Sequence, residues 1–152
     1  YKAAYYKGGN TNAGYWLYPA SSNTPPGRDV NDPSGNNANL ATIGSGGGPI
    51  QSPYYTTVGG EFQNSASPFG TFDQGGNVKE WNEAIMLGSF PARGIRGGGF
   101  SDSEFSPAAD WRDFEFTRIE SSNTGFRVVT IPGPSSVALL AIGGVMATRR
   151  RR

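Results

Sequence analysis

The density of glycine and proline is the feature that most limits the folds open to this chain. Among its 152 residues are 23 glycines and 11 prolines, about a fifth of the total. Glycine adopts positive backbone dihedral angles and proline lacks a backbone N–H, so both concentrate in turns and loops. The 9 Phe, 7 Tyr and 3 Trp make the chain too aromatic to be disordered. We therefore expect a packed but loop-rich fold with short strands and few long helices.

Cysteine and histidine are both absent from the sequence. Their absence excludes a thiol nucleophile, a disulfide framework, a Cys/His zinc site and a histidine general base among these residues. The formal net charge is +1, but four of the 13 basic residues are the consecutive arginines at 149–152. The other basic residues are scattered along a mildly acidic chain. No nucleic-acid partner is expected, because a basic surface that could bind phosphates is missing.

Short patterns of apolar and polar residues predict the regular elements. Residues 77–81 alternate as a half-buried strand does, and 94–100 form a second extended segment. The β-branched run 125–131, bounded by glycine and proline, is the clearest strand. Residues 15–18 predict a further short strand, and 1–6 have a composition suited to the end of a helix.

The segment 69–81 carries the residues best suited to bind a metal ion. Asp73 and Glu80 lie on either side of a Gly-Gly turn that can bring both carboxylates to one site. Gly76 and Val78 can add backbone carbonyl oxygens. These four oxygen donors suit Ca²⁺, which takes about six to eight oxygen ligands. The same spacing also fits a simple hairpin with an acidic turn, so the pattern alone leaves both interpretations open.

The order of motifs along the chain resembles the formylglycine-generating enzyme, or sulfatase-modifying factor, superfamily. Residues 70–81, Gly-Thr-Phe-Asp-Gln-Gly-Gly-Asn-Val-Lys-Glu-Trp, are similar to the family motif Gly-Leu-Tyr-Asp-Met-x-Gly-Asn-Val-x-Glu-Trp. Residues 96–100 resemble its Arg-Gly-Gly-Ser-Trp motif, and 111–112 stand where the family has Ala-Arg. Residues 123–127 resemble its Gly-Phe-Arg ending, and 1–4 resemble the end of its Glu-Trp-Glu-Tyr-Ala-Ala segment.

This resemblance covers residues 1–131 and carries expectations about fold and metal binding. It implies an irregular, loop-rich α+β fold with short strands, related to C-type lectin-like units and often holding Ca²⁺. It also implies that 1–131 is only the C-terminal part of such a domain, whose N-terminal half is missing. By position, the family's calcium sites fall on Asp73, Gly76, Val78 and Glu80 and, at a second site, on Asn39 and Leu40.

The same resemblance carries expectations about activity. Enzymes of this superfamily bind copper through a cysteine pair, and ergothioneine-type relatives hold iron through histidines. The corresponding stretch here, 101–107, contains no cysteine, so no copper is expected. The resemblance thus implies a non-catalytic binding or structural module with a glycan or protein ligand. The alternative is a superfamily enzyme, of the oxidoreductase type that modifies proteins, whose catalytic ligands lie in the missing N-terminal part.

Four carboxylates near that stretch have two interpretations. They belong to Asp102, Glu104, Asp110 and Asp113. Two of them could form an acid/base pair in a cleft. Acidic residues in a serine-rich loop more often simply face water.

Aromatic and arginine side chains follow the same acidic stretch. Trp111, Phe114 and Phe116 are expected in the core, with stacking on a sugar as the alternative. Arg112 and Arg127 are expected to act as structural hydrogen-bond donors rather than to bind a substrate.

Residues 132–152 resemble a bacterial PEP-CTERM sorting signal. Residues 132–134 read Pro-Gly-Pro where the signal has Pro-Glu-Pro, and the apolar run 137–148 precedes four arginines. As a helix this run would span only ~18 Å of a ~30 Å hydrocarbon core, unless flanking residues extend it. A buried C-terminal helix is the other interpretation. The resemblance implies export, membrane anchoring through 137–152, a sorting transpeptidase as partner, and a place at the cell surface or in the extracellular matrix.

Overall fold

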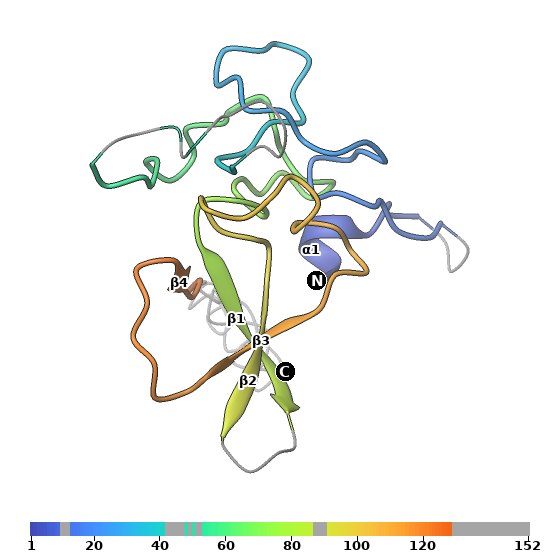
Figure 1. Cartoon of the computed structure of the whole chain (residues 1–152). Helices are drawn as coiled ribbons and strands as arrows, with labels where there is room; N and C mark the ends of the chain where they lie inside the picture. Colours follow the sequence, from blue (N-terminus) through green and yellow to red (C-terminus); the bar gives the residue numbers. More distant parts are fainter. Residues whose placement is uncertain (10–12, 42–47, 49, 51–52, 87–90, 129–152) are drawn as a thin grey trace, which may run out of the picture.

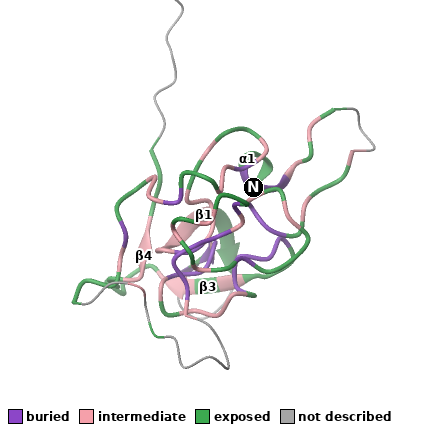
Figure 2. Ribbon diagram, turned by 90° about the horizontal axis from the view of Figure 1, so that it is seen from above, coloured by how far each residue is buried: buried purple, intermediate pink, exposed green. Residues whose placement is uncertain are grey.

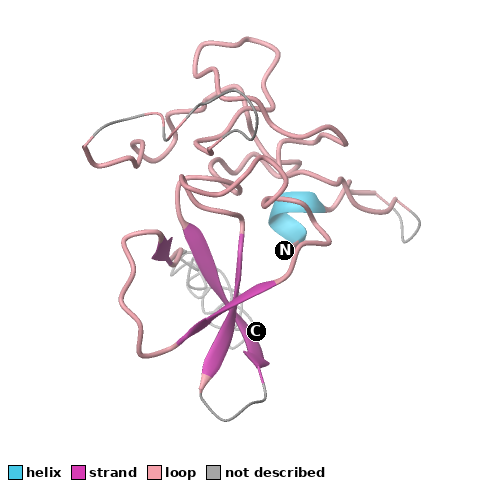
Figure 3. Ribbon diagram, in the orientation of Figure 1, coloured by secondary structure: helices cyan, strands magenta, loops and turns pink. Residues whose placement is uncertain are grey.

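Loops and turns make up most of the molecule. The structure, a computed structural model, describes residues 1–9, 13–41, 48, 50, 53–86 and 91–128. Within these ranges it contains one short helix and one four-stranded sheet (Figure 3). The prediction of an irregular, loop-rich chain with short strands and little helix is therefore confirmed.

The helix α1 (Lys2–Tyr5) is a single turn, as the composition of residues 1–6 predicts. The Tyr5 side chain is only 3% exposed. Its hydroxyl donates a hydrogen bond of 2.7 Å to the carbonyl oxygen of Pro107. Ala4 and Tyr5 also pack with Ala109 in one buried cluster. Tertiary contacts, rather than the helix's own hydrogen bonds, therefore hold this turn in place.

The sheet consists of β1 (Lys79–Met86), β2 (Ala92–Arg96), β3 (Asp113–Phe116) and β4 (Thr124–Gly125). Its strand order is β3-β2-β1-β4. The pairs β1–β2 and β2–β3 are antiparallel, whereas β1 and β4 run parallel. The sheet is strongly twisted (Figure 1), as short sheets of this kind usually are.

The strand predictions agree with the structure only in part. The strand expected at 77–81 forms, but it begins at Lys79 and continues to Met86. The segment 94–100 overlaps β2, which ends at Arg96. Residues 15–18 form only isolated bridges.

The strand predicted at 125–131 is wrong for residues 126–128, because its pairing ends at Gly125. Phe126 is 77% and Val128 is 83% exposed. These residues have the β-branched and aromatic composition of a strand, but no strand among the described residues pairs with them. Residues 129–131 lie outside the described part of the chain.

The core lies mainly among the loops, as the buried segments in Figure 2 show. The largest buried apolar side chains are Tyr5, Tyr18, Leu40, Phe62 and Ile95. Of these, only Ile95 belongs to a strand. The loops therefore fix the positions of the polar groups described below.

The aromatic side chains on the edge strand β3 and just before it are partly exposed. Trp111 is 50% and Phe114 is 48% exposed, so the expectation that both lie in the core is wrong. Phe116 is half-buried. An edge strand has a neighbour on one side only, which leaves its aromatic residues less covered.

Among the residues that the structure describes, no helix is long and apolar enough to cross a membrane. The predicted sorting tail, 132–152, lies outside the described residues.

Candidate functional site

The structure brings the two predicted sets of calcium ligands together. The Asn77 N–H donates a hydrogen bond of 2.8 Å to the carbonyl oxygen of Asn39. Gly76 has a φ of +79°, and a Cβ at this position would lie 2.7 Å from the same carbonyl oxygen. Only glycine allows this close approach in that conformation. The loop carrying Asn39 and Leu40 therefore packs directly on the turn between Asp73 and Glu80.

The Asn39 side chain has one polar atom without a partner. This residue is 1% exposed. Its Nδ2 donates to the carbonyl oxygen of Tyr55 at 2.8 Å and to Oδ1 of Asn77 at 3.2 Å. Its Oδ1 is buried and has no hydrogen-bond partner among the described residues. A buried acceptor left unsatisfied costs about 1–3 kcal/mol, so this oxygen is suited to bind a cation or a water molecule.

Asn77 links this amide to a second buried oxygen, which sequence reasoning missed. Its Oδ1 accepts a hydrogen bond of 2.9 Å from Thr57 N–H, and its Nδ2 donates to the Thr57 carbonyl oxygen at 3.1 Å. Thr57 is 7% exposed, and its Oγ1 also lacks a partner in the described part of the chain. In the sequence, Asn77 stands out as the polar residue after the Gly-Gly pair. Nothing in the sequence indicates that its side chain binds Thr57.

The two predicted carboxylates are bound by different groups of the chain. The Asp73 carboxylate accepts a hydrogen bond from the backbone N–H of Gly60. The Glu80 carboxylate forms an ion pair with Nε of Arg127, and Nη1 of this arginine donates to the Phe72 carbonyl oxygen at 2.8 Å. The pKa of Glu80 is raised above its usual value, mainly because the side chain is buried. Arg127 lowers this pKa, and repulsion from Asp73 adds to the increase. Arg127 is thus a structural hydrogen-bond donor, as predicted, and it binds Oε1 of a predicted metal ligand.

The remaining predicted ligands occupy the turn and the residue before β1. The Gly76 N–H donates to the Gly97 carbonyl oxygen at 2.7 Å. Val78 is half-buried and immediately precedes β1. Across the described residues, no three acidic side chains are grouped so that they could hold a metal ion. Any cation here would depend mainly on amide and carbonyl oxygens.

The acidic loop does not form an acid/base pair. Nζ of Lys79 lies 3.4 Å from Oδ2 of Asp102 and 3.5 Å from Oδ2 of Asp113, so one ammonium group bridges both carboxylates. Asp110 is exposed and Glu104 is partly exposed. This arrangement connects β1 to β3 and the 99–102 turn. It is better suited to structural support than to proton transfer.

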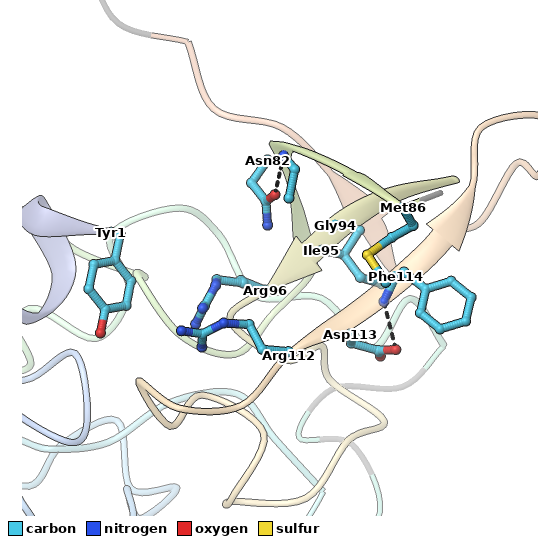
Figure 4. Close-up of a pocket in the computed structure, with 10 residues that line it drawn as sticks. Tyr1, Asn82, Met86, Gly94, Ile95, Arg96, Arg112, Asp113 and Phe114 are labelled. Atoms are coloured by element: carbon cyan, nitrogen blue, oxygen red, sulfur yellow. Dashed lines mark hydrogen bonds between the residues drawn. The ribbon is translucent and has the colours of Figure 1, made fainter. Parts of the chain in front are cut away.

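A cavity of about 530 Å³ lies against β1, β2 and β3 (Figure 4). Its lining includes Tyr1, Asn82, Met86, Arg96, Arg112 and Phe114. No motif in the sequence indicates this cavity, because its residues come from segments far apart in the chain. Arg112 donates to the carbonyl oxygens of Ala109 and Trp111, so it makes structural hydrogen bonds, as predicted, although they use only one of its nitrogen atoms.

Comparison of the chain with families of proteins, with curated proteins and with solved structures gives no match.

Proposed function

We propose that this chain is the C-terminal part of a formylglycine-generating-enzyme-like domain that is stabilised by Ca²⁺ and has no catalytic activity of its own. In this proposal it is exported, anchored at the cell surface through its C-terminal tail, and binds a glycan or protein ligand. The observation that carries the proposal is the buried, unpartnered Oδ1 of Asn39, beside the turn that holds the other predicted ligands.

The chemistry around Asn39 fits a cation that prefers oxygen ligands. Nδ2 is already engaged by two acceptors, so Oδ1 is the atom available to a ligand. Asn39 would contribute this oxygen and Leu40 its backbone carbonyl oxygen. Calcium accepts neutral amide and carbonyl oxygens as well as carboxylates, and extracellular sites bind it at ~10⁻⁴–10⁻³ M.

The turn that packs against the Asn39 loop would supply the other predicted set of ligands. Arg127 binds Oε1 of Glu80, which leaves Oε2 as the oxygen that this residue would contribute. Asp73 would add its carboxylate, and Gly76 and Val78 their carbonyl oxygens. A cation shared by these loops would stabilise a molecule whose core is built mainly from loops.

The absence of catalytic activity is supported by composition and by geometry. The 152 residues contain no cysteine and no histidine. The two acidic side chains that approach each other, Asp102 and Asp113, are both paired with Lys79. Binding is therefore the role that the described residues support best.

The calcium part of the proposal is tested by thermal melting in calcium and in a chelator. The quantity compared is the increase in Tm that calcium produces, which cancels losses unrelated to the metal. At a calcium concentration about ten times Kd the ion adds roughly 1.4 kcal/mol, a shift of a few degrees. Asp73→Ala and Glu80→Ala should each abolish this increase. Glu83→Ala, which removes an exposed carboxylate on β1, should preserve it; equal increases in all four proteins would remove the assignment.

A further inference from the structure

The cavity against β1–β3 has two chemically different ends (Figure 4). At one end, the guanidinium groups of Arg96 and Arg112 lie beside each other, with the Tyr1 ring facing them. At the other end, Met86 and Phe114 lie close together near Ile95. Such a combination of charged and apolar walls is typical of sites for small organic ligands.

The two arginines are held together by a neutral group. Nη1 of Arg96 and Nη1 of Arg112 both donate to the Ala109 carbonyl oxygen, at 3.0 and 2.8 Å. Burial lowers the pKa of Arg96, and repulsion from Arg112 lowers it further. The Arg96 guanidinium also lies 5.1 Å from the centre of the Tyr1 ring. Two like charges are thus held close to each other, beside backbone carbonyl oxygens and an aromatic face.

No carboxylate in the described residues forms an ion pair with either arginine. Asp113 lines the same cavity, but its carboxylate is paired with Lys79 at 3.5 Å. Asp110 raises the pKa of Arg96, but its effect is smaller than the effects of burial, Arg112, Tyr5 and Tyr1. Each guanidinium has five N–H donors, and the hydrogen bonds to the described chain use Nη1 alone. Donors therefore remain for an anion.

The opposite end supplies apolar surface. Met86 is 45% and Phe114 is 48% exposed, whereas Ile95 between their strands is 1% exposed. The exposed side chains can be covered by the body of a ligand without any rearrangement of the buried ones. Burying such surface is favourable at about 25 cal/mol per Å².

We propose that this cavity binds an organic carboxylate, with the anion held between Arg96 and Arg112 and an aromatic or other apolar body against Met86 and Phe114. Guanidinium groups bind carboxylates through paired, charge-assisted hydrogen bonds, which favours this anion class. This inference names a ligand class for the binding role proposed above and rests on that role, but it does not depend on the calcium site. If calcium stabilises the protein but carboxylates do not bind to it, this inference alone is contradicted.

The test is isothermal titration calorimetry of the full chain with 4-phenylbutyrate and with its uncharged amide. The acid should give saturable binding and the amide should bind at least about tenfold more weakly, since hydrogen bonds between charged partners are lost. Absence of binding by the acid at millimolar concentration, or equal binding of acid and amide, would overturn the proposal.

Matched variants locate the binding. Arg112→Gln should weaken binding of the acid by at least about tenfold. Phe114→Ala should weaken binding of both the acid and the amide. Arg93→Gln alters an exposed arginine on β2 that does not line the cavity, and it should change nothing. All three positions are exposed, and circular dichroism checks that each variant is folded. Wild-type affinity in folded Arg112→Gln would exclude this site.

A third ligand tests whether the bound carboxylate belongs to a free small acid or to the C-terminus of a protein chain. N-acetyl-phenylalanyl-phenylalanine carries a peptide's C-terminal carboxylate beside an aromatic side chain. Tighter binding of this peptide than of 4-phenylbutyrate would assign the cavity to chain ends of proteins. Tighter binding of 4-phenylbutyrate would assign it to free small acids.

Discussion

Asparagine side chains hold together loops that have few backbone ladders between them. Asn37 is 6% exposed. Its Nδ2 donates to Oδ2 of Asp32 at 3.0 Å and to the Gly35 carbonyl oxygen at 2.8 Å, while its Oδ1 accepts from Asp29 N–H at 2.9 Å. All the polar atoms of this amide are thus engaged, in contrast to Asn39. Within the described residues, Oδ1 of Asn39 thus differs from Oδ1 of Asn37 and, like Oδ1 of Asn36 and of Asn123, remains available to a ligand.

Tyr5 should contribute to stability through its buried hydroxyl. Tyr5→Phe removes the hydrogen bond to Pro107 and leaves a buried carbonyl oxygen, so we expect the free energy of unfolding to fall by about 1 kcal/mol. Urea denaturation at neutral pH measures this change. The control is Tyr54→Phe, whose side chain is 82% exposed and should be neutral; equal effects of the two variants would contradict this account.

The same hydroxyl predicts a dependence on alkaline pH. Burial raises the pKa of Tyr5 above its ordinary value. A tyrosine whose pKa is higher in the folded than in the unfolded state stabilises the fold below pH ~10, and this contribution is lost as pH rises further. Wild type should therefore lose stability more steeply than Tyr5→Phe above pH ~10 in urea denaturation. Identical slopes would show that the hydroxyl titrates normally.

Asp32 should titrate below the ordinary range of an aspartate. Hydrogen bonds from the Ser34 hydroxyl and backbone N–H lower the pKa of Asp32 most, and Asn37 lowers it further. Its contribution to stability is present above the unfolded pKa of ~3.9 and is lost as pH falls through the lower folded value. An NMR titration of the carboxyl carbon measures this pKa. Ser34→Ala should raise it, and an unchanged midpoint would contradict the assigned cause.

At the scale of elements, the strand predictions are correct only where a partner strand lies nearby. The alternation before Trp81 correctly indicates β1, because β2 pairs with it along most of its length. The more strand-like run after Gly125 fails, because that composition does not reveal whether a neighbouring strand exists. The strand β3, Asp-Phe-Glu-Phe, also alternates polar and apolar residues, but over only 4 residues, and it is positioned by its pairing with β2. Local pattern thus predicts the tendency to form a strand, whereas pairing decides where the strand ends.

Glycine at position 76 should be essential for packing the Asn39 loop on the turn. Gly76→Ala would combine a φ of +79° with a Cβ 2.7 Å from the Asn39 carbonyl oxygen. We expect a loss of about 1–3 kcal/mol in the free energy of unfolding. Gly59→Ala is the matched control, since a Cβ there would meet no atom within 4 Å. Chemical denaturation in chelator separates this effect from calcium binding, and a loss no larger than that of the control would refute the packing argument.

At the scale of the whole molecule, the candidate site depends on contacts that no short motif contains. The oxygen donors of the 73–80 turn can be proposed from their spacing. The contact of this turn with Asn39, the role of Thr57, and the Arg127 ion pair join segments that are far apart in the sequence. These contacts follow from the packing of the loops. The cavity lined by Arg96 and Arg112 likewise depends on segments that are far apart in the chain. Residue types therefore predict the kind of chemistry, and tertiary packing decides which groups meet.

The predicted tail gives a separate test at this scale. Deletion of residues 132–152 should move the protein from the membrane fraction of its native cells to the medium, because it removes the apolar run and the arginines that we propose as the anchor. Immunoblots of the two fractions measure this change. Replacing only the four arginines with serine should weaken retention less than the full deletion. Unchanged membrane retention after the deletion would rule out an anchoring role.

The central claim is tested most directly by equilibrium dialysis of the full chain against radioactive calcium at about 1 mM, within the range of extracellular calcium sites. Wild type should retain about 0.5–0.9 calcium ion per chain, the occupancy of one site with a Kd of ~10⁻⁴–10⁻³ M. Asn39→Ala should retain markedly less, because it removes the buried oxygen that has no other partner. Absence of retained calcium in wild type, or equal retention by folded Asn39→Ala, would contradict the account.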